Sequence, residues 1–181
     1  MKMAKKLLAV VLAGVLALSV LTGCGNTVST KTIADVLSDM YKSWGITYKA
    51  DPELNEKAKE IIDKAGLANQ TALLAEDDEP SDSDVSLEDI VLTDDQCAAI
   101  LKILGDGYAD KYVEVSFVKT KGNNVTTQAA GLLMNSQNIT DYEYDYYEHG
   151  GTLRIGTTTF TWKETSYRFA VIVGDVEVEK N

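Results

Sequence analysis

Histidine and cysteine, which often act as catalytic bases and nucleophiles, are few in this chain of 181 residues. His149 is the only histidine, so any nucleophile–histidine–acid triad would have to use it. The sequence lacks a G-x-S-x-G elbow, a phosphate-binding loop, a dinucleotide-binding glycine pattern and paired C-x-x-C knuckles. Acidic residues number 28, and composition alone selects no catalytic pair among them. We therefore expect no catalytic residue, no metal site and no cofactor, and a binding or structural module rather than an enzyme.

A tyrosine-rich segment, DYEYDYYEH at 141–149, is the densest candidate for recognition. Its aromatic and imidazole side chains are Tyr142, Tyr144, Tyr146, Tyr147 and His149. Tyrosine combines a large, rigid face with a polar tip, a combination that is enriched at binding surfaces. Such a surface suits stacking on a cell-wall glycan or gripping a cationic peptide. The alternative is that alternate tyrosines pack on the edge of a sheet while the acids face water.

The N-terminus has the order of an export signal. Three lysines precede an apolar stretch at 7–20, which is shorter than the roughly 20 residues that a membrane-crossing helix needs. The sequence Leu21-Thr22-Gly23-Cys24 then resembles the bacterial lipobox, in which the cysteine receives a diacylglyceryl group and becomes the new N-terminus. Lipid on Cys24 would hold the chain to the extracytoplasmic face of the cell membrane. This predicts a signal peptide at 1–23, a lipidated tether at 24–29 and a single domain at 30–181.

Cleavage of the signal peptide would change the charge and the cysteine count. Loss of three lysines leaves 14 basic residues against 28 acidic ones, a net charge of −14. A surface of that sign repels phosphate backbones, so nucleic acid is not an expected partner. Cys97 is the one cysteine besides Cys24, and it falls on the apolar stripe of a predicted helix. We expect it to be a small buried hydrophobe rather than a catalytic thiol.

Apolar spacing predicts the regular elements of the mature chain. The helices are expected at 30–44, at 51–65, at 93–104 and from Thr126 or Thr127 to Met134, the last with Ala130, Leu133 and Met134 on its core side. The strands are expected at 112–119, 153–162 and 167–173, with 163–166 as the turn of a hairpin and 157–161 as an exposed face. The acidic stretch at 76–89 is interpreted as a solvated loop, because Pro80 and Ser83 stand where a calcium loop needs an acid and a glycine.

The last strand is apolar at nearly every residue from 169 to 173, which is typical of a central strand covered on both sides. Helices on both faces of the sheet are the simplest cover. We therefore predict an α+β fold, a three-layer α-β-α sandwich with a small, mostly antiparallel sheet.

Three stretches resemble the CAP superfamily of cysteine-rich secretory, antigen-five and pathogenesis-related proteins. Residues 45–54, GITYKADPEL, resemble the entry to the family's early helix. Residues 126–137, TTQAAGLLMNSQ, resemble the helix that normally ends in W-x-x-S-x-x-H, and 153–156, LRIG, resemble a core strand. The resemblance implies an α-β-α sandwich with a central cleft.

The same resemblance implies a degenerate member. Typical members hold two histidines and two glutamates in the cleft, a set able to bind zinc. In this chain Ser136 is followed by Gln137, Asn138 and Ile139, so the histidine of that phrase is missing. The expected function is a lipid-anchored, non-catalytic module of the cell envelope that binds a cell-wall glycan, a peptide or an envelope protein. The alternative is an envelope hydrolase using carboxylates in a CAP-like cleft.

Overall fold

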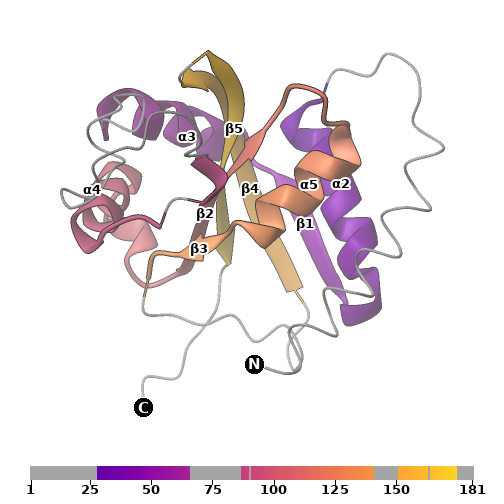
Figure 1. Ribbon diagram of the computed structural model, residues 1–181. Helices are drawn as coiled ribbons and strands as arrows, with labels where there is room; N and C mark the ends of the chain where they lie inside the picture. Colours follow the sequence, from indigo (N-terminus) through magenta and orange to yellow (C-terminus); the bar gives the residue numbers. More distant parts are fainter. Residues whose placement is uncertain (1–27, 66–86, 90, 141–150, 163, 175–181) are drawn as a thin grey trace.

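The computed structural model describes residues 28–65, 87–89, 91–140, 151–162 and 164–174. Within these ranges the chain forms four α-helices and five β-strands (Figure 1). The helices are α2 (Thr30–Tyr41), α3 (Pro52–Lys64), α4 (Asp94–Leu104) and α5 (Val125–Met134). The strands are β1 (Ile46–Ala50), β2 (Tyr112–Lys119), β3 (Gln137–Asn138), β4 (Gly151–Trp162) and β5 (Thr165–Gly174). Short 3-10 turns lie at η1 (Lys42–Trp44), η2 (Leu87–Asp89) and η3 (Asp106–Tyr108).

Side-chain caps begin the first three helices where the sequence predicts. Ser29 and Thr32 form a capping box at α2, and Thr93 and Gln96 form another at α4. Asp51 accepts hydrogen bonds from the first backbone N–H groups of α3, and proline follows it at the first helical position. The predicted helices at 51–65 and 93–104 are confirmed to within one residue at each end, whereas the helix predicted at 30–44 ends at Tyr41 and continues as the 3-10 turn η1.

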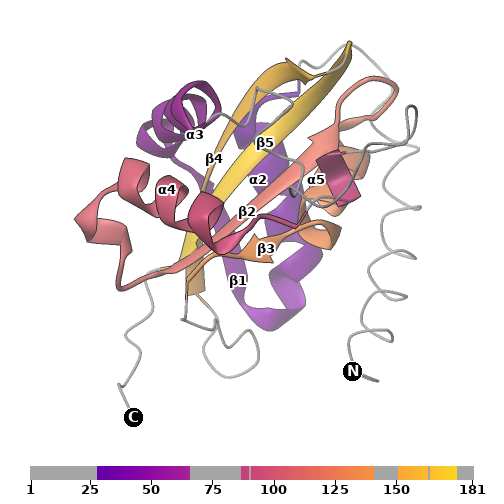
Figure 2. The ribbon, with the colours of Figure 1, turned by 60° about the vertical axis from the view of Figure 1, so that its left-hand side comes forward.

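The five strands form one mixed sheet in the order β1-β4-β5-β2-β3 (Figures 1 and 2). β4 and β5 are joined as an antiparallel hairpin, and β5 pairs with β2 along eight residue pairs. β1 is parallel to β4, whereas β3 is antiparallel to β2. The sheet is therefore mostly antiparallel, with β5 at its centre as predicted.

Helices cover both faces of this sheet. α2 and α5 lie on one face and α3 and α4 on the other, which Figure 1 shows nearly edge-on. Successive residues of β5 point to opposite layers, so Phe169 and Val171 pack toward α3 and α4, while Ala170 and Ile172 pack toward α2 and α5. The three-layer α-β-α sandwich predicted from the sequence is the observed fold.

β1 is a strand that the sequence analysis missed. Gly45, with a φ of 70°, ends the η1 turn and sends the chain back beside β4. β1 pairs with β4 only as far as Ile155. After β1 the chain enters α3 and passes over Gly156 of β4. A Cβ atom at Gly156 would lie 2.2 Å from the backbone carbonyl carbon of Leu54. Only glycine allows α3 to approach the strand so closely.

α5 begins earlier and faces differently than predicted. Its cap is Asn124, whose side chain accepts from the Thr127 backbone N–H, rather than Thr126 or Thr127. The buried side chains are Thr126, Gln128, Ala129 and Leu132, and the predicted core residue Met134 is 56% exposed. The apolar pattern misled because this helix buries a polar pair, Thr126 and Gln128, against the sheet.

The β4–β5 hairpin also differs in detail from the prediction. The turn has two residues, at 163–164, because Trp162 pairs with Thr165, and Glu164 has the left-handed φ of 65° that tight hairpin turns require. The threonine-rich strand is not uniformly exposed: Thr159 and Thr161 face water, but Thr157 is buried. Its hydroxyl belongs to a buried polar network described below.

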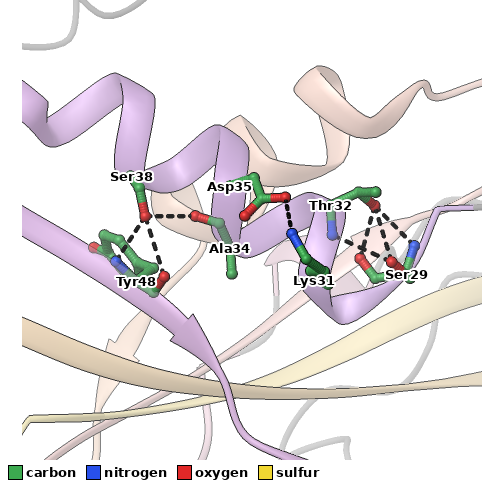
Figure 3. A network of polar contacts seen from close by, with 7 residues as sticks. All are labelled: Ser29, Lys31, Thr32, Ala34, Asp35, Ser38 and Tyr48. Carbon is green, nitrogen blue, oxygen red and sulfur yellow. Dashed lines mark hydrogen bonds and ion pairs between the residues drawn. The ribbon is translucent and has the colours of Figure 1, made fainter.

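Side chains close the rims of the sheet. Ser38 of α2 lies against the outer edge of β1, where its Oγ accepts from the Tyr48 N–H at 2.8 Å and lies 3.1 Å from the Tyr48 carbonyl oxygen (Figure 3). On the other side, where β3 has ended, Asn135 donates to the Phe117 carbonyl and Glu88 accepts from the Lys119 N–H. At these positions the backbone groups of the sheet edges are bonded to the protein's own side chains.

No helix in the described ranges is long and apolar enough to cross a membrane.

Candidate recognition site

The structure describes the residues that flank the predicted recognition segment but not the segment itself. The predicted recognition residues that lie outside the described residues are Tyr142, Tyr144, Tyr146, Tyr147 and His149. Thr140 precedes the segment and Gly151 follows it. Thr140 lies beside Val113, close to where β2 begins, and Gly151 is the first residue of β4. Because β2 and β4 both pair antiparallel with β5, these two points lie at the same end of the sheet. We call it the loop end.

Hydrogen bonds fix both flanks of the segment. Thr140 donates through its backbone N–H and its hydroxyl to the Asn138 side-chain oxygen, and its hydroxyl accepts from the Val113 N–H. Gly151 donates to the Gly45 carbonyl oxygen at 3.2 Å. Three inter-strand steps separate β3 from β4, which corresponds to about 14 Å. The segment 141–150 therefore starts and finishes at rigid positions on opposite halves of the sheet.

The half-buried carboxyl group of Glu114 lies close to the loop end in the layer under α2 and α5. The Ser136 hydroxyl donates to its Oε1 at 3.1 Å, and the Tyr112 hydroxyl also binds it. Burial raises the pKa of the Glu114 carboxyl, and the two hydroxyl donors only partly offset that rise by stabilising the anion. A carboxyl that holds its proton to a higher pH than usual is a candidate proton donor or pH-sensitive contact.

A hollow of about 290 Å³ opens at the same end, between α2 and β1. Its lining residues are Ser38, Asp39, Lys42, Gly45, Ile46 and Thr47. It offers one carboxylate and one ammonium group next to the Gly45 carbonyl that holds Gly151. Neither this hollow nor the surroundings of Glu114 brings two described carboxylates together. A carboxylate pair for the hydrolase alternative would have to include residues outside the described part.

The opposite end of the same layer holds a buried cation, Arg168, which is only 7% exposed. Its three hydrogen bonds, each 2.9 Å long, go to the Gln128 side-chain oxygen, the Thr157 hydroxyl and the Val28 carbonyl. All three acceptors are neutral, and burial lowers the pKa of the guanidinium, which stays protonated. We call this the tether end, because Val28 is the first described residue of the chain.

The hydroxyl groups beside Arg168 form a directional chain. Thr30 donates its single hydroxyl proton to the Asn55 side-chain oxygen, so toward Thr157 it acts as the acceptor. Thr157 in turn accepts from Arg168 and donates to Thr30. The Asn55 oxygen also accepts from the Thr157 backbone N–H, which lies beyond the last residue of β4 that pairs with β1. This chain of bonds ties the starts of α2 and α3 to the sheet.

Cys97 lies in the other layer and is half-buried against the cluster under α3 and α4. Burial, and next the charge of Asp94, raise the pKa of its thiol, so little of it is thiolate at neutral pH. Gln137 donates to its sulfur at 3.7 Å. The environment fits the predicted role as a small hydrophobe, and it would slow the thiol in any nucleophilic reaction.

Among the described residues, no group of three histidine, cysteine, aspartate or glutamate side chains is placed to hold a metal ion. The lipid-acceptor candidate, Cys24, lies outside the described residues. Comparison with protein-family models, with curated proteins and with solved structures gives no match. The resemblance to the CAP superfamily therefore stays a prediction, and function has to be argued from this chain's own geometry.

The sequence analysis passed over Glu114, Arg168 and Ser38. The first two carried a usable signal, because each is a single charged residue between apolar neighbours in a strand: Glu114 follows Val113, and Arg168 precedes Phe169. A charge in such a position requires buried partners. Ser38 carried none, since a serine on a helix gives no indication of which strand edge it will contact.

Proposed function

We propose that the chain is a lipoprotein held by Cys24 to the extracytoplasmic face of the cell membrane, where its domain is a non-catalytic binding or structural module of the cell envelope. The recognition surface is the loop end, and residues 141–150 supply its aromatic side chains. The ligand is a cell-wall glycan, a peptide or an envelope protein.

The observation that supports this proposal is the separation of the two ends. Val28 lies at the level of Thr157, because both bind Arg168, and Gly151 lies six residues earlier on β4. At about 3.3 Å per residue this separation is roughly 20 Å. The chain thus enters the domain near the middle of β4, about 20 Å from the loop end that carries its tyrosine-rich connection. Such an arrangement suits a module that is anchored on one side and meets its ligand on the other.

Anchoring is tested on the full-length chain expressed in a bacterial host that processes lipoproteins. We expect the intact mass of the mature protein to match a chain that begins at Cys24 and carries acyl groups. Cys24→Ala should lack the lipid and should be recovered in the soluble fraction or as the uncleaved precursor. An unmodified mature chain that begins at another residue would overturn the anchoring part of the proposal.

Recognition is tested by replacing Tyr144 and Tyr146 together with serine. If both contact the ligand, binding of the mature protein to isolated cell wall should fall at least about tenfold, because aromatic contacts at an interface are commonly worth 1–2 kcal/mol or more. The free energy of unfolding should change by less than about 0.5 kcal/mol. Lys121→Ser, an exposed change at the tether end, is the matched control and should leave binding intact.

The opposite outcome would be equally informative. If the two tyrosines pack on the sheet instead, the double variant should lose several kcal/mol of stability, since each large-to-small aromatic change in a core costs roughly 3–5 kcal/mol. A large fall in melting temperature would therefore remove these residues from the recognition surface.

A further inference from the structure

The position at which the chain enters the domain is fixed within a few residues of the proposed lipid. The Val28 carbonyl oxygen accepts from Arg168, and Ser29 caps α2 directly after it. Val28 follows Cys24 by four residues. Four residues span at most about 14 Å when fully extended. The rigid part of the domain therefore begins no more than that distance from the acylated cysteine.

This reach decides which end of the domain can face the membrane. If the loop end rested on the bilayer, Val28 would stand about 20 Å above it, farther than the tether extends. With the tether end toward the bilayer, Val28 stands about 13 Å above the level of Thr161, four residues along β4 from Thr157, which an extended tether can span. An inverted orientation is thus excluded by length alone, without any attraction between the protein and lipid.

The tether end also has a surface that suits contact with lipid headgroups. The turn after β2 lies there, because Thr120 donates from its backbone to the Ser166 carbonyl beside the β4–β5 turn. Its exposed side chains are polar: Lys121 in that turn, with Asn124 and Thr127 at the start of α5. Lys31, in the first turn of α2, is also exposed and forms an ion pair with Asp35 at 2.7 Å, and the β4–β5 turn adds the exposed carboxylate of Glu164. Ammonium, amide and hydroxyl groups of this kind hydrogen-bond phosphate oxygens without entering the hydrocarbon.

We propose that the tether end of the domain lies against the extracytoplasmic surface of the cell membrane and keeps the loop end turned away from it. This end is formed by the start of α2, the turn at 120–124 and the β4–β5 turn. The partner is the phospholipid headgroup layer. The inference depends on the proposed lipid at Cys24, and it adds a fixed orientation to that function.

The test measures the height of two labels above the bilayer. Lys121→Cys and Thr152→Cys each place an exposed thiol, the first at the tether end and the second at the loop end. Both are made in the full-length chain with Cys97→Ala, so that one reactive thiol carries the fluorophore. The mature lipidated protein is reconstituted into phosphatidylcholine–phosphatidylglycerol vesicles that contain an acceptor fluorophore on a lipid headgroup. Energy transfer then reports the distance of each label from the surface.

We expect the label at residue 121 to transfer at least about twofold more efficiently than the label at 152. The two positions are nine residues apart along the strand direction, because Thr120 lies beside Ser166 and Ser166 pairs with Thr161, which gives roughly 30 Å. Equal transfer, or more transfer from residue 152, would overturn the orientation. If the intact mass shows no lipid, the proposed anchoring itself fails and the inference falls with it.

A variant with a longer linker tests whether tether length, rather than another cause, orients the domain on the membrane. Twenty glycine and serine residues inserted after Gly25 give the tether a root-mean-square reach of about 25 Å. That reach exceeds the separation of Val28 from the loop end, so the difference in energy transfer between the two labels should shrink markedly. If the difference persists in full, tether length is not what orients the domain.

Discussion

The two layers on either side of the sheet are built on different principles. Under α3 and α4 the buried side chains are aromatic and aliphatic, with Phe169, Phe117 and Trp162 among them. Under α2 and α5 the sheet carries aliphatic side chains and tyrosines together with polar groups. Tyrosine and tryptophan aside, all five buried polar side chains in the described part belong to this second layer: Ser116, Thr126, Gln128, Thr157 and Arg168.

The two layers therefore contribute differently to the stability of the fold and to the positions of its segments. An apolar layer gains free energy in proportion to the surface it buries, but it tolerates repacking. A buried polar network adds little net free energy, yet it allows only the geometry that satisfies its hydrogen bonds. Here the polar groups hold the chain entry through Arg168 and flank the loop end through Glu114. The polar layer thus holds the chain entry and one flank of the loop end in place, and we expect the apolar layer to contribute more of the stability.

The largest expected effect comes from neighbouring residues that face opposite layers. Phe169→Ala empties a fully buried site against Phe117, whose ring centre is 5.0 Å away, and should cost roughly 3–5 kcal/mol of unfolding free energy. Arg168→Met keeps the side-chain length but leaves the Gln128 oxygen and the Val28 carbonyl without their donor, and should cost about 1–3 kcal/mol. Urea denaturation measures both. A larger loss at Arg168 than at Phe169 would reverse the roles assigned to the two layers.

A pH-dependent effect is expected at Glu114. Its pKa in the folded state is raised by burial, so the ionised form destabilises the fold at pH values above that pKa. The penalty disappears as pH falls below about 4.3, the usual pKa of glutamate in the unfolded chain. Glu114→Gln should therefore be more stable than the natural chain at pH 7, and the gain should shrink toward pH 4. Denaturation at both values checks this, with exposed Glu164→Gln as the control. A loss of stability at pH 7 would contradict it.

The smallest effect is expected at Ser116. This serine is 1% exposed, and its hydroxyl has no hydrogen-bond partner among the described residues. Ser116→Ala removes a desolvated polar group without leaving another one unsatisfied, so the unfolding free energy should stay within about 0.5 kcal/mol or rise slightly. A loss above 1 kcal/mol in thermal or urea unfolding would mean that Ser116 is bonded after all and belongs to the polar network.

Elements with a strong local signal could be predicted from the sequence. The apolar spacing of α2, α3 and α4 and the apolar run of β5 depend on neighbouring residues alone, and they predicted three helices and the central strand. β1 was missed because a five-residue edge strand is defined by its pairing with β4, about 105 residues away, as the pairing of Ile46 with Gly151 illustrates. The buried face of α5 was predicted wrongly because it includes Gln128, whose burial depends on its hydrogen bond with Arg168.

The candidate site was predictable only in part. The tyrosine density of 141–149 and the lipobox at Cys24 are local features of the sequence, and both stay predictions. That the flanks of the tyrosine segment lie about 20 Å from the entry of the chain follows only from the strand order and register. The network of Arg168 joins Val28, Gln128 and Thr157, residues up to 140 positions apart, and no local pattern encodes it.

The side-chain contacts at the two edges of the sheet would matter for a protein confined to a surface. Lipid anchoring, as proposed, would concentrate copies in two dimensions, where sideways collisions between domains are frequent. An open strand edge would then template cross-β growth between neighbours. With the Ser38 hydroxyl on the Tyr48 backbone and the Asn135 amide on the Phe117 carbonyl, colliding copies meet satisfied backbone groups at these positions. Each such bond removes a backbone group at which a neighbouring copy could add a strand.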